Sequence, residues 1–351
     1  MSFTVTVMPS GHSFPVERDE PILMAAIRQG VGLPYGCKDG ACGSCKSRLK
    51  EGRVIHGAHQ VKALTNAEEE AGWVLTCRAA PQTDVIIEAR SLLNTADFPV
   101  RKMPARVHSI DKPAPDVAIL RLQLPTNEQW RYRAGQYVEF ILPTGQRRSY
   151  SMANAPHRQL ALLGSGHPGI ELHLRHLPGG VFTDQVFSRL KVRDILRLEG
   201  PYGSFHWQAD SAKPIVLLAS GTGFAPIKAI IEEMRAKRSL QPVALYWGCR
   251  SRVDLYLHEW AQAVAAEWPL LRYEPVLSEP RPADAWLGRT GWVHHAVMHD
   301  LPDLSQHEVY ACGAPVMVAA AQADLVQRCG LPAEAFHADP FTSAADNSSA
   351  G

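Results

Sequence analysis

The sequence predicts a multidomain α+β protein with three successive domains of different fold class. At 351 residues, the chain is longer than one ordinary hydrophobic core supports. Its middle contains many short strand patterns and one short helix pattern, whereas its last third alternates strands with long helices. We therefore expect domains at 1–91, 102–208 and 209–341, a linker at 92–101 and a disordered polar tail at 342–351.

Composition and charge exclude several classes of protein. The net charge is +1 and charged residues make up 20% of the chain, without the basic bias of a nucleic-acid-binding protein. The N-terminus lacks the basic start and apolar core of a signal peptide, and no apolar run reaches the roughly 18 residues of a membrane span. We expect a cytoplasmic protein with no membrane span and no nucleic-acid partner.

The first domain combines alternating strand patterns with one helix pattern. Residues 3–8 and 12–16 alternate between apolar and polar side chains, which is typical of half-buried strands. Residues 21–30 indicate a helix, with Pro21 suited to its first turn and Gly30 to its C-terminal cap. Further strand patterns and a short acidic helix follow at 45–50, 66–72, 73–77 and 85–89.

The stretch GCKDGACGSC at 36–45 carries the first chemical signal. Cys37, Cys42 and Cys45 have the spacing C-x4-C-x2-C, and the next cysteine is Cys77. This is the plant-type [2Fe–2S] spacing, in which four thiolates bind the cluster. The glycines of this stretch can adopt positive φ and leave room for the inorganic sulfides, and they are Gly36, Gly40 and Gly43.

Zinc and disulfides are the alternatives for these thiols. Zinc sites usually carry two C-x2-C pairs or added histidines, whereas this loop has one such pair and no histidine. Seven cysteines in a chain without a secretion signal disfavour disulfides. The iron–sulfur interpretation is therefore preferred.

The middle domain reads as an antiparallel barrel or sandwich. A short helix pattern lies at 183–190, among strand patterns at 105–110, 117–124, 137–142, 149–154, 169–176 and 194–200. Within GQRRSYSMAN at 145–154, a strand edge offers a guanidinium for phosphate, an aromatic ring for stacking and hydroxyl groups. LPGGVFTDQV at 177–186 places two glycines before a helix start, with Thr183 as a possible cap, and such a turn suits phosphate.

The last domain alternates strands and helices, as parallel α/β sheets do. Its strand patterns lie at 214–219, 243–249, 271–277 and 308–313, and its helix patterns at 224–237, 254–267 and 316–330. The turn GTG at 221–223 follows a strand, and YWGCR at 246–250 and YACGAP at 310–315 each end one. Ligands of open α/β sheets bind at that edge, and a helix N-terminus favours phosphate there.

These motifs resemble known families. Residues 1–90, with LPYGCKDGACGSCKSRL and LTCRA, resemble a plant-type ferredoxin domain, and the remainder resembles the ferredoxin–NAD(P)+ reductase family. The resemblance implies a β-grasp first domain, an antiparallel β-barrel flavin domain and a Rossmann-like nucleotide domain. It also implies that the metal ligands are Cys37, Cys42, Cys45 and Cys77.

The resemblance assigns flavin contacts to the middle domain. It implies that Arg148 holds the flavin pyrophosphate beside Ser149, that Tyr150 stacks on the isoalloxazine, and that Ser151 lies near the reactive N5 atom as a catalytic residue. His173 contacts the flavin through backbone atoms or is simply structural. The pyrophosphate loop is Gly180, Val181, Phe182 and Thr183. An N-terminal ferredoxin domain favours FAD over FMN, because relatives with that domain order typically use FAD.

The resemblance also assigns the nicotinamide nucleotide site. The phosphate turn is Gly221, Thr222, Gly223 and Pro226. Cys312, as a catalytic residue, and Gly313 lie beside the nicotinamide, and Phe341 covers the flavin. Arg250 lies where the ribose is read. Ser251, Arg252 and Tyr256 would accommodate NADPH, but GCRSRVDLY also resembles NADH-using oxygenase reductases, so both remain open, with NADH preferred.

Together, the three domains predict an NAD(P)H-dependent oxidoreductase that passes electrons through FAD and a [2Fe–2S] cluster. The expected acceptor is a separate oxygenase or hydroxylase. The alternative is a sugar-deoxygenating dehydratase, because residues 178–205 resemble CDP-6-deoxy-3,4-glucoseen reductases. A third hypothesis, from another class, is a zinc-bearing flavoprotein or binding module without electron output.

Overall fold

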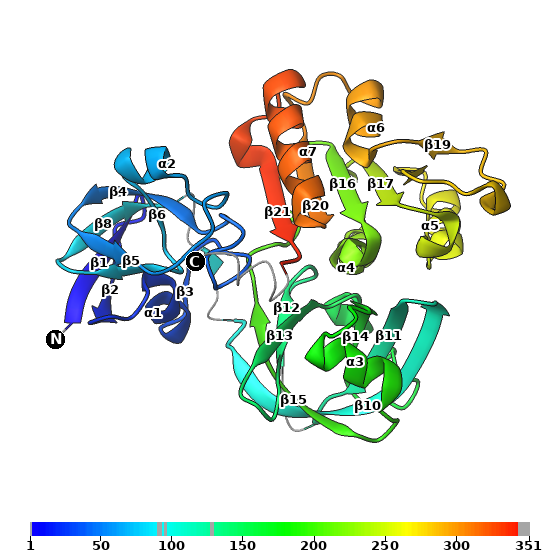
Figure 1. Ribbon diagram of the computed structural model, residues 1–351, viewed down its shortest axis with the longest axis horizontal. Coiled ribbons are helices and arrows are strands. Elements are labelled where there is room, and N and C mark those ends of the chain that lie inside the picture. The colour runs from blue at the N-terminus through cyan, green and yellow to red at the C-terminus, as the bar shows by residue number, and fades with distance from the viewer. Residues whose placement is uncertain (1, 90–92, 95–96, 127–129, 343–351) are drawn as a thin grey trace. The chain divides into compact units, whose positions relative to one another are not determined.

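The computed structural model of the protein describes residues 2–89, 93–94, 97–126 and 130–342. The chain forms two compact units, and Figure 1 shows their elements. Unit 1 comprises Met1–Val100, Tyr202–Phe205 and Asp339–Gly351, and unit 2 comprises Arg101–Pro201 and His206–Ala338. Unit 2 thus holds most of the predicted middle and C-terminal domains. The predicted tail at 342–351 lies outside the described residues beyond position 342.

Unit 1 is built on a five-stranded mixed sheet in the order β2-β1-β8-β4-β6. Strands β1 and β8 are parallel, whereas β1–β2, β4–β8 and β4–β6 are antiparallel. Val5, Val7 and Ile87 alternate inward and are almost fully buried, as the alternating pattern predicts. The elements of unit 1 are β1 (Ser2–Met8), β2 (His12–Glu17), α1 (Ile22–Arg28), β3 (Val31–Gly32), β4 (Lys46–Glu51), β5 (Val54–His56), α2 (Asn66–Glu70), β6 (Trp73–Leu75), β7 (Ala79–Pro81), β8 (Val85–Glu88) and β9 (Leu93–Asn94).

Capping residues set the limits of the two helices of unit 1. In α1, Pro21 is the N-cap rather than a first-turn residue, and the helix stops at Arg28 before Gly30, whose φ of 71° only glycine adopts readily. Helix α2 begins with a capping box, in which Thr65 and Glu68 satisfy each other's backbone N–H groups.

The first sheet of unit 2 has six strands in the order β13-β12-β15-β10-β11-β14. Its pairs β10–β11, β10–β15, β11–β14 and β12–β13 are antiparallel, and a bridge joins Met152 to Leu172 at the two outer strands. Apolar side chains including Leu120, Phe140 and Leu172 form its core. The elements are β10 (Arg101–Ala114), β11 (Val117–Gln123), β12 (Tyr137–Ile141), β13 (Arg147–Ser151), β14 (Gly169–Arg175), α3 (Val181–Ser188) and β15 (Ile195–Tyr202).

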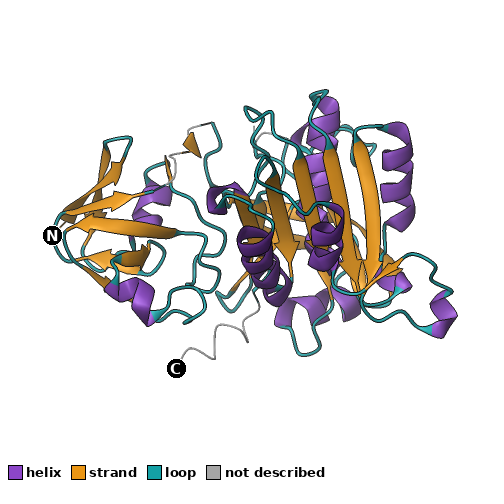
Figure 2. Ribbon diagram, turned by 90° about the horizontal axis from the view of Figure 1, so that it is seen from above, coloured by secondary structure: helices purple, strands orange, loops and turns teal. Residues whose placement is uncertain are grey.

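The second sheet of unit 2 has the order β19-β18-β17-β16-β20-β21. The pairs β16–β17, β16–β20, β17–β18 and β18–β19 are parallel, and Figure 2 shows helices on both faces of this sheet. The elements are β16 (Ile215–Ser220), α4 (Phe224–Ala236), β17 (Val243–Cys249), α5 (His258–Glu267), β18 (Leu271–Leu277), β19 (Arg289–Thr290), α6 (Val293–Asp300), β20 (Glu308–Gly313), α7 (Pro315–Arg328) and β21 (Phe336–Pro340).

The helices of this sheet depart from the sequence pattern at two places. Helix α5 begins at His258, four residues later than the predicted 254, because Asp254 instead caps a short 3-10 turn at Arg252–Asp254. Helix α6 was not predicted. None of the helices among the described residues is both long and apolar enough to cross a membrane.

Candidate functional site

The four cysteines of the predicted cluster site come together in unit 1. Cys37, Cys42 and Cys45 lie in the loop between β3 and β4, and Cys77 follows β6. The thiols form two neighbouring pairs, because Cys37 and Cys42 influence each other's pKa and Cys45 influences that of Cys77. All seven cysteines, each within the described residues, are free of disulfides. The structure therefore brings the four predicted thiols together as two pairs.

The loop backbone directs hydrogen-bond donors at one sulfur. The N–H groups of Cys37 and Ser44 donate to Cys42 Sγ over 3.3 and 3.5 Å. The Cys37 thiol and these donors lower the pKa of Cys42 to about 6, whereas a neighbouring thiol and burial raise the pKa of Cys37 and of Cys77. The donor set therefore fits a thiolate-bound iron–sulfur cluster.

The loop glycines serve two different needs. Gly40 and Gly43 adopt φ of 83° and 77°, as predicted. Gly36 does not belong to the positive-φ glycines, so that part of the prediction is wrong. Its role is spatial, because a Cβ at Gly36 would lie 3.2 Å from Ser44 Oγ and 3.4 Å from Cys42 Sγ.

The predicted flavin residues lie on β13. Tyr150 packs against Phe140 and Phe182 with ring centroids 5.9 and 5.5 Å apart. The Arg148 guanidinium donates to the Arg147 carbonyl at 2.7 Å and stays near the surface, whereas Ser151 is buried. Ser149 Oγ lies 3.5 Å from a carboxylate oxygen of Glu139.

The predicted pyrophosphate loop leads into α3. The helix begins at Val181 with Gly180 as its N-cap, so Thr183 is not the cap that the sequence suggested. Thr183 Oγ1 instead donates to the Leu177 carbonyl at 3.0 Å and accepts from the Leu177 N–H at 3.2 Å. The threonine therefore closes the Leu177–Gly180 turn, and Phe182 is buried behind it.

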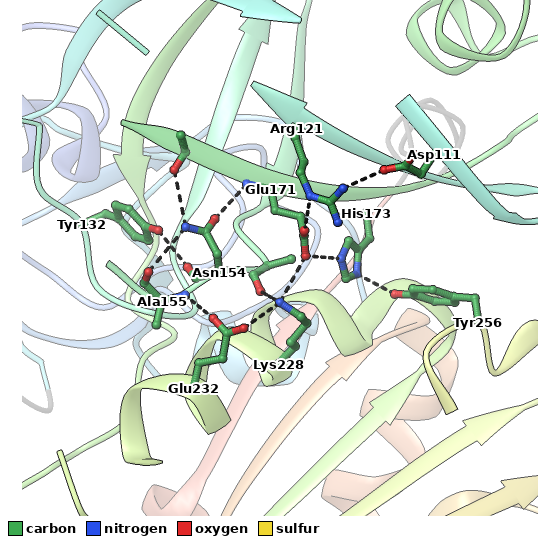
Figure 3. Close-up of polar contacts among 12 residues, drawn as sticks. Asp111, Arg121, Tyr132, Asn154, Ala155, Glu171, His173, Lys228, Glu232 and Tyr256 are labelled. Atoms are coloured by element: carbon green, nitrogen blue, oxygen red, sulfur yellow. Dashed lines mark hydrogen bonds and ion pairs between the residues drawn. The ribbon is translucent and has the colours of Figure 1, made fainter. Parts of the chain in front are cut away.

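His173 on β14 has a side chain that is fully engaged within the protein. Its Nδ1 lies 2.8 Å from the Tyr256 hydroxyl and its Nε2 lies 3.1 Å from Glu171 Oε1 (Figure 3). Burial lowers the pKa of His173, so the ring is neutral at pH 7. Any flavin contact of His173 is consequently left to its backbone.

A buried ion cluster, which the sequence did not predict, lies beside β13 and β14. Lys228 Nζ on α4 contacts Glu171 Oε1 at 3.1 Å, Glu232 Oε1 at 2.9 Å and the Ala153 carbonyl at 3.0 Å (Figure 3). Lys228 is 7% exposed and Glu171 is 4% exposed. The one available signal was a lysine within the apolar run FAPIKAII, because a charge on the buried face of a helix requires a partner.

The predicted phosphate turn connects β16 to α4. Gly221–Gly223 form a single 3-10 turn, Gly221 has a φ of 51°, and α4 begins at Phe224 with Pro226 in its first turn. Thr222 is buried. Trp247 Nε1 donates to the Gly221 carbonyl at 3.0 Å and holds the turn against β17.

The turn after β16 and the turn after β20 interlock. A Cβ at Gly223 would collide with the Cys312 carbonyl, and a Cβ at Gly313, whose φ is 130°, would collide with Ser220 Oγ. The Ala314 N–H donates to Ser220 Oγ at 2.9 Å. The structure thus brings the phosphate turn and the Cys312–Gly313 pair together, with the Cys312 side chain buried.

The loop after β17 holds its hydroxyl and cationic groups in internal contacts. Ser251 Oγ donates to Asp254 Oδ2 at 2.9 Å, and Arg252 Nη1 donates to the Asp284 carbonyl at 3.3 Å. Tyr256 is buried against His173. Arg250 remains exposed. Phe341 follows β21 within unit 1 and is half-buried.

Comparison with known families identifies the three parts of the chain. Residues 5–82 match the family model of the 2Fe-2S iron-sulfur cluster binding domain. Residues 104–207 match that of the oxidoreductase FAD-binding domain, and residues 217–323 match that of the oxidoreductase NAD-binding domain. The chain therefore carries binding domains for all three predicted cofactors.

Curated relatives match over nearly the whole chain. The CDP-6-deoxy-L-threo-D-glycero-4-hexulose-3-dehydrase reductase of Yersinia pseudotuberculosis is 38% identical over 345 residues, covering 97% of this chain and 99% of the relative. The terephthalate 1,2-dioxygenase reductase component 2 of Comamonas is 34% identical over 343 residues, covering 97% and 98%. The phenol hydroxylase P5 protein of Acinetobacter pittii is 34% identical over 351 residues, covering 99% and 96%.

Two solved structures also match this chain over nearly its whole length. The Amycolatopsis cytochrome P450 reductase GcoB superposes with a TM-score of 0.79 at 33% identity, covering 97% of this chain and 99% of that chain. A ferredoxin reductase of a carbazole 1,9a-dioxygenase shares the fold with a TM-score of 0.68 at 24% identity, covering 97% and 99%. Both matches extend across the described part of both units.

Proposed function

Because the chain belongs to the family of ferredoxin-type reductases that join 2Fe-2S, FAD-binding and NAD-binding domains, we propose that it delivers electrons from NAD(P)H to a separate oxygenase or hydroxylase. Bound FAD accepts two electrons together as a hydride and releases them singly to the one-electron cluster. The observation that carries the proposal is the presence of all three binding domains in one chain that matches oxygenase reductases end to end.

Within this proposal, the metal ligands are Cys37, Cys42, Cys45 and Cys77. The convergence of their thiols and the N–H donors at Cys42 support the assignment. Arg148, Ser149, Tyr150 and Ser151, with the Gly180–Thr183 turn, hold the flavin, and the position of Tyr150 among buried rings supports its role as a stacking surface. His173 contributes backbone groups, and Phe341 covers the flavin.

The nucleotide site consists of the phosphate turn with Pro226, the Cys312–Gly313 pair and Arg250. The interlocked turns at the carboxyl ends of β16 and β20 support this assignment, since ligands of open α/β sheets bind there. We further propose domain limits of 1–91, 102–208 and 209–341, with the linker at 92–101. The mixed sheet of unit 1 is then a β-grasp and the first sheet of unit 2 a β-barrel, which the Met152–Leu172 bridge supports.

NADH is the preferred nucleotide in this proposal. Three groups that would receive a 2′-phosphate, on Ser251, Arg252 and Tyr256, already bond to other protein groups. The carboxylates of Asp254 and Asp284 lie in the same loops and oppose an added dianion. Arg250 and Arg252 are both exposed there, but the Arg252 guanidinium already donates to the Asp284 carbonyl.

A second acceptor is favoured by one observation. The Yersinia relative, whose name describes the reductase of a CDP-hexulose dehydrase, is 38% identical, compared with 34% for the two oxygenase reductases described above. A sugar-deoxygenating dehydratase is therefore the alternative partner.

Anaerobic titration of the purified protein tests the function. We expect NADH to bleach the flavin and cluster bands in sequence and to produce a rhombic [2Fe–2S] signal in electron paramagnetic resonance. The proposal would be refuted if the protein binds zinc in place of iron. It would also be refuted if neither NADH nor NADPH reduces the flavin. Electron delivery to a purified oxygenase and to a CDP-hexulose dehydrase then separates the two acceptors.

A further inference from the structure

We propose that the buried cluster of Glu171, Lys228 and Glu232, together with the His173–Tyr256 pair, positions the nicotinamide nucleotide for hydride transfer to the flavin. The inference rests on the proposed function. These groups are positioning residues, because they contact protein groups on both sides of the site and act through the elements that they hold.

The first connection runs from Lys228 to the segment after the flavin strand. Lys228 Nζ donates to the Ala153 carbonyl at 3.0 Å, two residues after Ser151. One helical turn further along α4, Glu232 Oε2 accepts the Ala155 N–H at 2.9 Å. Two consecutive turns of α4 therefore grip one short backbone segment (Figure 3).

The same lysine is close to the nucleotide turn. Lys228 lies five residues after Gly223 on α4, a rise of about 7 Å along a helix axis. Helix α4 begins directly after that turn, so a shift of α4 moves the turn with it. The Lys228 contacts thus relate the phosphate turn to the strand that carries Ser151.

The second connection starts from β14. Glu171 and His173 are two residues apart on β14, so they project from the same face. Glu171 reaches Lys228 on α4, whereas His173 reaches the Tyr256 hydroxyl after β17. Tyr256 packs edge-on against Trp247, whose Nε1 holds the Gly221 carbonyl. Both ends of the phosphate turn are therefore tied to β14.

The charges of the cluster make it rigid. Glu171 accepts from Arg121 Nε at 2.8 Å in addition to His173 and Lys228, and Arg121 continues to Asp111 (Figure 3). Burial alone would raise the pKa of Glu171, but His173, Lys228 and Arg121 together lower it, so the carboxylate stays ionised. A buried charge that loses its partner is strongly disfavoured, so the elements cannot slide apart without penalty.

Rapid-mixing kinetics of the holoprotein test the proposal. In Lys228→Met, we expect the first-order rate of flavin reduction by NADH to fall about tenfold, since a misplacement of about 1 Å can cost about a hundredfold. The apparent Kd for NADH should change less, and the isotope effect with 4-deuterated NADH should rise toward its intrinsic value. The flavin and cluster absorbance should match the unaltered protein.

Lys237→Met is the matched control. Lys237 also pairs with a glutamate of α4, Glu233, but its side chain is 56% exposed. Its flavin reduction should stay within about twofold of the unaltered protein, because exposed pairs contribute little. If Lys228→Met lowers the melting temperature but reduces flavin at the unaltered rate, the cluster is only structural and the proposal is wrong.

Two milder variants cover the case in which Lys228→Met fails to fold or to retain FAD. Tyr256→Phe removes only the hydroxyl that bonds His173, and Glu232→Gln removes one charge from a partly exposed side chain. Each should slow flavin reduction about threefold or more, since a lost hydrogen bond of about 1 kcal/mol corresponds to roughly fivefold. Unaltered rates in both would overturn the proposal. An unaltered protein that neither nucleotide reduces would instead refute the proposed function.

Discussion

At the scale of single residues, the hydrogen bonds to Cys42 Sγ bear on the redox properties of the proposed cluster site. Cys42 is the sulfur on which two backbone N–H groups converge, and hydrogen bonds to cluster sulfurs are one means by which proteins set reduction potential. In the proposed cluster site, Cys42 would be both a ligand and a point at which the protein sets the potential, whereas Cys249, Cys312 and Cys329 lie in unit 2, outside the loop.

The Cys42→Ser variant tests this role. We expect it to abolish reduction of cytochrome c, because that acceptor receives electrons from the cluster, and to spare NADH–ferricyanide activity at the flavin. Steady-state assays with the two acceptors measure the difference. Cys329→Ser makes the same change in the core of unit 2 and should keep both activities. Equal loss of both activities in Cys42→Ser would mean that the loop has only a structural role.

A glycine at the interlocked turns offers a second residue-scale test. Gly223 has a φ of −57°, so alanine there meets no backbone strain, but its Cβ would collide with the Cys312 carbonyl and with the Gly313 Cα. We expect Gly223→Ala to lower the free energy of unfolding by about 1–3 kcal/mol, the range for overpacking, and to weaken NADH reduction of the flavin. Thermal melting and rapid mixing measure the two effects.

Gly145→Ala is the control for Gly223→Ala, because it introduces backbone strain without a steric collision. Gly145 has a φ of 80°, but a Cβ there meets nothing within 4 Å. That variant should lose only about 1 kcal/mol and keep the rate of flavin reduction. If Gly223→Ala reduces its flavin as fast as Gly145→Ala does, the close approach of the two turns does not serve the nucleotide site.

At the scale of elements, we expect the loop after β17 to set the choice of nucleotide in the proposed site. We expect kcat/KM for ferricyanide reduction to be at least about tenfold higher with NADH than with NADPH, which corresponds to a difference of about 1.4 kcal/mol in free energy. Asp284→Asn should raise kcat/KM for NADPH severalfold with little effect on NADH, because it removes a carboxylate that holds Arg252 and Arg281.

Asp303→Asn is the control for that change. Asp303 lies on the same unit and caps the Ser305 N–H at 2.9 Å, in the segment after α6. It should leave both nucleotides unchanged. A native preference for NADPH, or an identical response in both variants, would contradict the assignment of this loop.

At the scale of the whole molecule, the buried side chain of His206 makes the stability of the fold depend on pH. Burial lowers the pKa of His206 to about 4, and its Nε2 lies 3.0 Å from Arg133 Nη1. Between that value and the ordinary value of 6.5, the unfolded chain binds a proton that the folded chain does not. Stability is therefore retained above pH 6.5 and lost as pH falls toward 4, by roughly 1.4 kcal/mol per pH unit.

Melting of the holoprotein between pH 7.5 and about pH 5 measures this dependence. We expect the melting temperature to fall with acidification, and less steeply in His206→Gln. His108→Gln, an exposed position on β10, should retain the full slope. An identical slope in all three proteins would show that other groups account for the acid sensitivity.

The sequence predicted most of the local structure, and the structure brings several of the predicted site residues together, for identifiable reasons. The four cysteines and the GTG turn are adjacent in sequence or follow strands, so spacing and topology bring them together. Lys228, Glu171 and Tyr256 become a cluster only through packing between elements that are distant in sequence, which spacing does not encode. Helix α6 was missed because GWVHHAVMHD is short and its apolar spacing, at Val293, Ala296 and Val297, spans little more than one turn.

The interlocked glycines also constrain how such chains can be recombined. Because the turns after β16 and β20 contact each other backbone to backbone, they must be inherited or grafted as a pair, although about 90 residues separate them. The loop after β17 is joined in turn to the segment after β18, because Arg252 Nη1 donates to the Asp284 carbonyl and the Glu279 N–H donates to the Arg250 carbonyl. A new nucleotide preference should therefore be engineered by exchanging these two segments together, and a crossover placed between Gly223 and Cys312 would join mismatched halves.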